Sequence, residues 1–191
     1  MDVETSNVIT LRGSTEIVTE FFEYSVNSIL YQRGIYPPES FKKVAKYGLA
    51  MMLTTDEALA AYLTNIMTQL HEWLMTDRVR KLVLVVKGVE SKETLERWVF
   101  NCESTSVTSE NCDITQVQSS KSQKEITQEI QAVVGQITAS VTFLPLLNEP
   151  CFFDLLVYAD DKASVPLTWE DSDPCHILNA EDVRLRSFDT K

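Results

Sequence analysis

The chain has 191 residues, a formal net charge of −11 at pH 7 and an apolar fraction of 44%. Its length suits one globular domain, and its apolar fraction is that of a folded protein. The negative charge argues against broad electrostatic attraction to DNA, RNA or anionic lipid. Because no apolar run reaches about 18 residues and the N-terminus has no basic-then-apolar pattern, we expect neither a membrane span nor a signal peptide. The four widely spaced cysteines, without a CxxC motif, indicate reduced thiols, as in a cytosolic or nuclear protein.

The first half of the chain predicts two long helices. Met1–Thr10 is polar, and we expect it to be a loose arm. A helix is expected from Ser14 to Gly34, because apolar side chains recur every three or four residues on a face broad enough to pack on two sides, which suggests a central helix. A second helix is expected after the capping-box spacing Thr54–Glu57, with the following apolar stripe: Leu59, Leu63, Ile66, Leu70 and Trp73.

Three strands and a loop are expected around this second helix. The short apolar run Tyr47–Leu53 precedes it as a strand. Leu82–Val86 is continuously apolar, which is typical of a strand covered on both faces. Leu95–Cys102 alternates large apolar and polar side chains, as a strand with two different faces does. Glu103–Ser120, rich in Ser, Thr, Asn and Gln, predicts a surface loop.

The chain is organised around the stretch Lys121–Tyr158. Ser122 and Glu125 have capping-box spacing and predict the start of a third amphipathic helix, whose pattern ends at Pro145. The apolar run up to Tyr158 is too short for a typical helix and rich in β-formers, so we expect a strand. Beyond it the chain is polar and acidic, with one further half-exposed strand at Val183–Phe188. Three helices and one mixed or antiparallel sheet predict an α+β domain with helices packed on a sheet face.

Catalytic and metal-binding motifs are not found in the sequence. His71 lies beside the apolar stripe of the second helix, and the pair Cys175–His176 lacks the partners of a zinc site. No dinucleotide-binding, P-loop or GxSxG motif is present. Acidic pairs such as Asp160–Asp161 stand near prolines and indicate solvated loop charge. We therefore expect no enzyme activity and no cofactor.

A peptide-binding module fits the pattern better. If the strand Phe152–Tyr158 lies at the edge of the sheet, its unpaired backbone groups would attract an extended peptide. A tail that closes over the peptide would add selectivity and slow its release. Trp169 would anchor such a tail, or it would only pin the tail to the core, and the sequence leaves both alternatives open.

Several stretches resemble the HORMA-domain spindle-checkpoint family, from about Val8 to Phe188. The most specific is the run NSILYQRGIYP (Asn27–Pro37). The others are ITLRGS (Ile9–Ser14), YGL (Tyr47–Leu49), TTD (Thr54–Asp56), LERW (Leu95–Trp98), KSQK (Lys121–Lys124), QITASVTFLPLL (Gln136–Leu147), FDLL (Phe153–Leu156) and EDVRLRSF (Glu181–Phe188).

The resemblance implies a non-enzymatic switch between an open and a closed state. It implies one HORMA domain over residues 8–191, after a flexible arm 1–7, with three helices on a mainly antiparallel sheet. In the closed state a "safety belt", here residues 159–191, holds a peptide against the edge strand. The implied peptide-binding residues are Phe152, Phe153, Leu155, Val157, Tyr158, Trp73 and Trp169.

The resemblance also implies partners and a location. The expected ligands are segments of the checkpoint scaffold, mitotic arrest deficient protein one, and of the mitotic activator of the anaphase-promoting complex, whose sequestration delays anaphase. The expected locations are nucleus, kinetochore and cytoplasm. The alternative is a HORMA adaptor for another assembly, of the polymerase or meiotic-axis type, and the matches at Asn27–Pro37 and at FLPLL (Phe143–Leu147) argue against it.

Two departures from the family pattern carry expectations of their own. The family normally has an arginine before the Gln-Ile-Thr segment, where it supports pairing of open with closed protomers, and here this position is Gly135. The implied dimer interface is Gly135, Gln136, Thr142 and Phe143, and we expect weak or altered self-association. Family members continue beyond the position of Lys191. We therefore expect a form that favours the open state and holds its ligand poorly.

Overall fold

The computed structural model describes residues 6–12, 15–102, 122–160, 163–167, 169–170, 183–184 and 188–189. The helices are α1 (Thr15–Gln32), α2 (Glu57–Met75) and α3 (Gln123–Ser140), with a 3-10 turn at Pro38–Ser40. The strands are β1 (Ser6–Arg12), β2 (Phe41–Lys46), β3 (Leu49–Thr54), β4 (Val79–Gly88), β5 (Thr94–Cys102), β6 (Cys151–Ala159), β7 (Val183–Arg184) and β8 (Phe188–Asp189).

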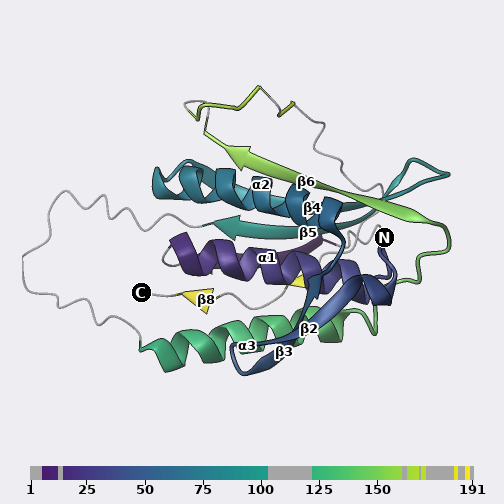
Figure 1. Cartoon of the computed structure of the whole chain (residues 1–191), viewed down its shortest axis with the longest axis horizontal. Coiled ribbons are helices and arrows are strands. Elements are labelled where there is room, and N and C mark those ends of the chain that lie inside the picture. Colours follow the sequence, from purple (N-terminus) through teal and green to yellow (C-terminus); the bar gives the residue numbers. More distant parts are fainter. Residues whose placement is uncertain are drawn as a thin grey trace, which may run out of the picture.

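Most strands form one sheet with the order β6-β4-β5-β1-β7, and β8 also pairs with β1. The β6-β4-β5 part is antiparallel, whereas β1 joins β5 in parallel. β2 and β3 form a separate antiparallel hairpin. Figure 1 shows the helices layered on this sheet, with α1 between α2 and α3, both of which it contacts. The α+β fold with three helices is confirmed.

The core explains the order of these layers. α1 buries side chains on a broad face, including Phe21, Phe22, Ile29 and Leu30, because it packs against both other helices, against β3 and, through the ring contact of Phe22 with Phe100, against β5. All residues of Leu82–Val86 in β4 are fully buried, so the strand covered on both faces is confirmed. The central position of α1 is also confirmed.

The N-terminal prediction is wrong for Ser6–Thr10. These residues belong to β1 and pair with β5 from Ser6 opposite Arg97 to Leu11 opposite Cys102. The polar composition suggested a loose arm. Pairing with β5, however, uses backbone hydrogen bonds, and these do not depend on which side chains Ser6–Thr10 carry. This pairing joins segments far apart in the chain, and no local pattern indicates it.

The segment before α2 also differs from its prediction. The expected strand at Tyr47–Leu53 is the second half of a hairpin, since Tyr47 and Gly48 form its two-residue turn with φ of 51° and 69°. β2 was missed because its lysines leave little apolar alternation. The helix cap is Asp56, whose carboxylate accepts the Leu59 N–H at 2.8 Å, rather than Thr54, which ends β3.

The second half of the chain follows the sequence more closely. The capping box of Ser122 and Glu125 is confirmed, and α3 ends at Ser140, ahead of Pro145. The strand up to Tyr158 is confirmed as β6. Of the strand expected at 183–188, only two-residue pieces along β1 are described. The predicted loop 103–120 lies outside the described residues, and the domain limits stay a prediction.

Candidate functional site

Strand β6 is the last strand at one side of the sheet and pairs only with β4 among the described residues. The Val89 N–H donates to the Pro150 carbonyl at 2.8 Å, and the Asp160 N–H donates to the Arg78 carbonyl at 2.9 Å. Since backbone groups alternate in direction along an antiparallel strand, the even-numbered residues between these two bonds face β4. The backbone groups of Phe153, Leu155 and Val157 therefore point outward. The predicted edge strand is present.

The side chains of β6 divide between the two faces of the sheet. Phe153, Leu155 and Val157 pack against the main core, on the helix-covered face. Tyr158 packs on a smaller cluster of Val83, Val85 and Val99, with the Lys81 ammonium 4.1 Å from its ring centre. Phe152 is 37% exposed. The five β6 residues predicted for peptide binding thus share an edge but not a face.

Trp73 and Trp169 come together from distant parts of the sequence, and their role in peptide binding stays a prediction. Their ring centroids are 5.1 Å apart and their planes are inclined by 70°. The Trp73 Nε1–H donates to the Ser164 carbonyl at 3.1 Å, and the Trp169 N–H donates to the Pro166 carbonyl at 2.9 Å. The first part of the belt segment therefore returns from β6 to the last turn of α2.

The belt leaves β6 at a fixed point. The Asp160 carboxylate accepts two hydrogen bonds from Arg80, one from Nε at 3.0 Å and one from Nη2 at 2.8 Å. Together with the backbone bond to Arg78, this pair holds the end of β6 against β4. Both side chains are partly exposed, so this ion pair adds little to the stability of the fold. Its main effect is to fix the point at which the chain leaves β6.

Sequence reasoning missed an aromatic cluster at the edge strand. Phe153 is flanked by Tyr62, with ring centroids 5.9 Å apart, and by Tyr36, at 6.2 Å. Burial raises the pKa of Tyr62, as does the nearby charge of Asp154, while a hydrogen bond from the Leu155 backbone opposes this rise. Tyr62 lies beside the apolar stripe of α2 rather than on it, which was the only available signal.

Of the predicted dimer residues, Gly135 and Gln136 lie in the second half of α3, and Thr142 and Phe143 follow its end. Gly135 and Thr142 are exposed, Gln136 is half-buried, and Phe143 is 58% exposed. A Cβ built on Gly135 meets nothing within 4 Å. The set is accessible, and its role in self-association stays a prediction.

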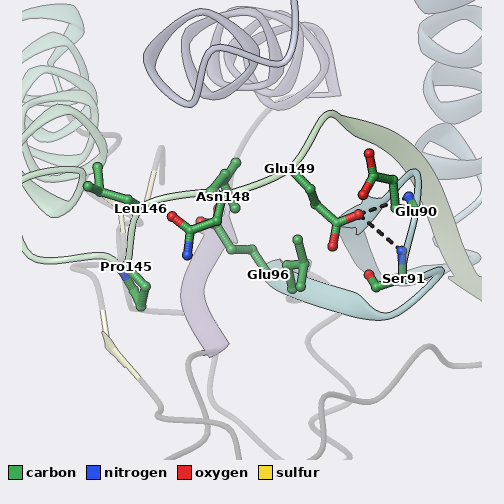
Figure 2. A pocket seen from close by; sticks show the side chains of 9 residues that line it. Glu90, Ser91, Glu96, Pro145, Leu146, Asn148 and Glu149 are labelled. Atoms are coloured by element: carbon green, nitrogen blue, oxygen red, sulfur yellow. Dashed lines mark hydrogen bonds between the residues drawn. The ribbon is translucent and has the colours of Figure 1, made fainter.

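A cavity of about 630 Å³ lies between the β4–β5 turn and the segment that leads into β6 (Figure 2). The Glu149 carboxylate accepts the N–H groups of Glu90 at 2.8 Å and Ser91 at 3.0 Å. Glu96, also in its wall, forms a buried ion pair with Arg33. The carboxylates of Glu149 and Glu96 in the cavity wall are thus engaged in contacts that stabilise the fold, and neither is placed for acid–base catalysis. In the described part of the chain, no group of three or more potential ligands is placed to hold a metal ion.

Comparison with known proteins identifies the class. The model of the HORMA domain matches residues 14–191, so the chain belongs to the HORMA-domain family. Within this family it is a MAD2 homologue. It is 56% identical to the mitotic spindle assembly checkpoint protein MAD2A of Dictyostelium discoideum over 182 residues, 95% of this chain and 87% of that protein. It is 54% identical to human MAD2A over 186 residues, with the same coverage.

Solved structures agree with this assignment. A chain of the "Crystal Structure of Mitotic Checkpoint Complex" superposes with a TM-score of 0.81 and 48% identity, covering 92% of this chain and 91% of that one. A Caenorhabditis elegans HTP-2 chain, solved with a HIM-3 closure motif, has a TM-score of 0.62 and 15% identity, covering 85% and 77%. This second likeness shows the fold alone.

Family membership also settles the expectation about catalysis. The HORMA and MAD2 proteins are adaptors, and the expectation that this chain is not an enzyme is confirmed on that ground. The DNA polymerase zeta processivity subunit of Schizosaccharomyces pombe is 27% identical over 157 residues, 82% of this chain and 73% of that protein. The polymerase-type alternative is thus the more distant one. No helix in the described ranges is long and apolar enough to cross a membrane.

Proposed function

We propose that the chain is a spindle-checkpoint adaptor that binds an extended peptide along β6 and holds it under the belt segment 159–191. The observation that carries the proposal is the outward direction of the backbone groups of Phe153, Leu155 and Val157 at the edge of the sheet. A peptide can add a strand there through main-chain hydrogen bonds. The contact between Trp73 and Trp169 supports the proposed belt, because it holds the start of segment 159–191 against α2.

The proposed ligands are segments of the checkpoint scaffold, mitotic arrest deficient protein one, and of the activator of the anaphase-promoting complex. The high identity to MAD2A proteins and the likeness to a chain of a mitotic checkpoint complex support this choice. The net charge of −11 favours a ligand with basic residues, because opposite charges speed the encounter. The proposed locations are nucleus, kinetochore and cytoplasm, which a fluorescently tagged chain in dividing cells would test.

Fluorescence anisotropy tests the peptide clamp. A labelled peptide with a basic residue, paired aliphatics and a downstream proline is titrated with the chain and with Val157→Pro. Proline removes an outward N–H that the added strand needs, so this variant should lose most of its affinity. Val157→Thr keeps both the N–H and the β-branched shape and is the matched control. Equal affinity of the proline variant, with its circular dichroism unchanged, would exclude binding along this edge.

The same titration, followed over hours, addresses the conformers. A ligand that contacts only one of two packings shifts their populations by its difference in affinity. The expectation that this chain favours an open state stays a prediction, and fast peptide release would support it. Slow release, with bound peptide remaining for hours after dilution, would contradict it.

A further inference from the structure

Two lysines of β4 extend toward β6 on the face of the sheet that carries Tyr158. In the β4–β6 pair, Lys81 is opposite Tyr158, and its ammonium lies 4.1 Å from the centre of the tyrosine ring. Lys87 contacts the Asp154 carboxylate, with 2.9 Å between Nζ and Oδ2. Residues of a strand that are two or four positions apart share a face, so Asp154 lies on the same face as Tyr158. Because β6 is the edge strand, both lysines are one strand away from a peptide that adds to this edge.

The two lysines differ in how their charge is balanced. Lys87 has a carboxylate partner, whereas Lys81 rests on an uncharged ring. Asp77 and Asp160 flank the end of the β4–β6 pair at which Lys81 lies, and both contact Arg80, at 3.9 and 2.8 Å. Among the residues that the structure describes, Lys81 is in no ion pair. This end of the edge therefore carries a positive charge without a partner, in a chain whose net charge is −11.

A peptide strand on β6 would meet this charge at one position. The peptide residue opposite Tyr158 would point to the same face, with its Cβ about 5 Å from that of Tyr158. An ammonium has three N–H donors, and stacking on a ring occupies only one side of it. The carboxylate of a peptide glutamate can therefore bind Lys81 beyond the edge of the ring. Opposite Asp154 no such preference arises, because Lys87 already balances that carboxylate.

We infer that Lys81 determines specificity at the peptide site, because it favours a carboxylate on the peptide residue opposite Tyr158. The inference rests on the proposed peptide-clamp function and names one chemical feature of the ligand. The net charge of the chain favours a basic peptide during the encounter, whereas Lys81 decides where along the edge an acidic residue lies. Lys81 also opposes a slip of the peptide along β6, since a shift by two residues takes the carboxylate away from the ammonium.

A glutamate scan of the peptide tests this specificity. Each residue of the labelled peptide is replaced in turn by glutamate, and anisotropy gives the Kd of every peptide for the unmodified chain and for Lys81→Met. Glutamate should tighten binding by about two- to fivefold at one position, as an exposed ion pair does, and Lys81→Met should abolish this gain. Lys87→Met is the matched control, because it removes a lysine of the same strand whose charge Asp154 balances, and the gain should remain. Circular dichroism checks that both variants are folded.

Charge reversal separates ligand recognition from a purely structural role of Lys81 on the Tyr158 ring. In Lys81→Glu, a lysine scan of the same peptide should show a gain at the position where glutamate gained in the unmodified chain. If Lys81 only supported the fold, its replacement would weaken the binding of all peptides equally. That result, or a glutamate gain that survives Lys81→Met, would overturn the inference.

The scan also distinguishes failure of the inference from failure of the clamp. Binding of the parent peptide, with no position at which glutamate improves it, would leave the clamp standing and remove the role of Lys81. Absence of binding by every peptide, with a folded chain, would refute the clamp and this inference with it.

Discussion

The indole of Trp73 meets that of Trp169 edge to face, with ring centroids 5.1 Å apart. Trp73 lies in the last turn of α2 and is 5% exposed, whereas Trp169 lies ten residues beyond the end of β6 and is half-buried. The contact therefore joins the start of the belt segment to the helix layer. It leaves two roles for Trp169, which the sequence could not separate either: a clamp on the ligand or a structural pin.

Substitution of Trp169 by leucine distinguishes these roles. An edge-to-face aromatic pair is worth about 0.5–1.5 kcal/mol beyond its buried area. If the pair clamps the ligand, Trp169→Leu should speed peptide release by about two- to tenfold. The free energy of unfolding of the peptide-free chain should then fall by less than the free energy of peptide binding does. Competition with unlabelled peptide gives the release rate, and urea titration gives the stability. A loss of stability with unchanged release would assign Trp169 to pinning alone.

The ion pair of Arg33 and Glu96 should dominate the electrostatic part of stability. Both side chains are 4% exposed, and Arg33 also donates to the Pro145 carbonyl at 2.6 Å. Glu96→Gln would leave the guanidinium charge buried without its counter-charge, which costs about 3–5 kcal/mol. Asp160→Asn, which breaks the exposed pair with Arg80, should cost less than about 1 kcal/mol. Urea unfolding of both variants checks the contrast, and equal losses would contradict it.

The sequence predicted elements well where the hydrophobic pattern is local. α1, α2, α3, β4 and β6 follow from apolar stripes, a capping box and a continuous apolar run. The edge position of β6 was only a conditional expectation, because strand order depends on contacts between distant segments. For the same reason β1 was missed, since its parallel pairing with β5 has no trace in the composition of Ser6–Arg12.

The candidate site was predicted unevenly. The resemblance supplied Trp73, Trp169 and the β6 residues, and the structure brings the two tryptophans together. Tyr62 was missed because a tyrosine beside a helical stripe is usually a partly exposed surface residue. Its place at the edge strand comes from its ring contact with Phe153, and no local pattern in the sequence brings α2 and β6 together.

The thiol of Cys102 should react very slowly in the folded chain. Burial raises the pKa of Cys102 to about 12. At pH 8.5 an unshifted thiol is about half ionised, so the thiolate fraction of Cys102 should be lower by roughly a thousandfold. Labelling with iodoacetamide, read by mass spectrometry in a Cys112→Ser/Cys175→Ser background, measures this with and without urea. Comparable rates in the two conditions would contradict the raised pKa.

The same pKa has a consequence for stability. At pH values well below 8.5 the thiol is protonated in both the folded and the unfolded chain, and Cys102 adds no pH dependence there. Above this pH the unfolded chain loses the proton while the folded chain keeps it, so stability should fall as pH rises toward 12. Cys102→Ala should reduce this fall, as urea titrations at pH 8 and pH 10 would measure.

Gly135 should be a point where the chain can be stabilised. It is an exposed residue in the interior of α3, its φ is not positive, and a Cβ there meets nothing within 4 Å. Gly135→Ala should therefore raise the free energy of unfolding by about 0.5–1 kcal/mol, because alanine loses less backbone entropy in a helix. Gly34→Ala is the contrasting variant, since the φ of 65° at Gly34 makes alanine strained and should lower stability.

The same position should control self-association. We expect weak pairing in the unmodified chain, and stronger pairing in Gly135→Arg, which places a long cation beside Gln136 on an exposed position in the second half of α3. Sedimentation velocity over a concentration series measures both, with Gly135→Ala as the control for helix stabilisation. If alanine and arginine strengthened pairing equally, helix order would be the cause. A tight dimer of the unmodified chain would refute the expectation that glycine here weakens association.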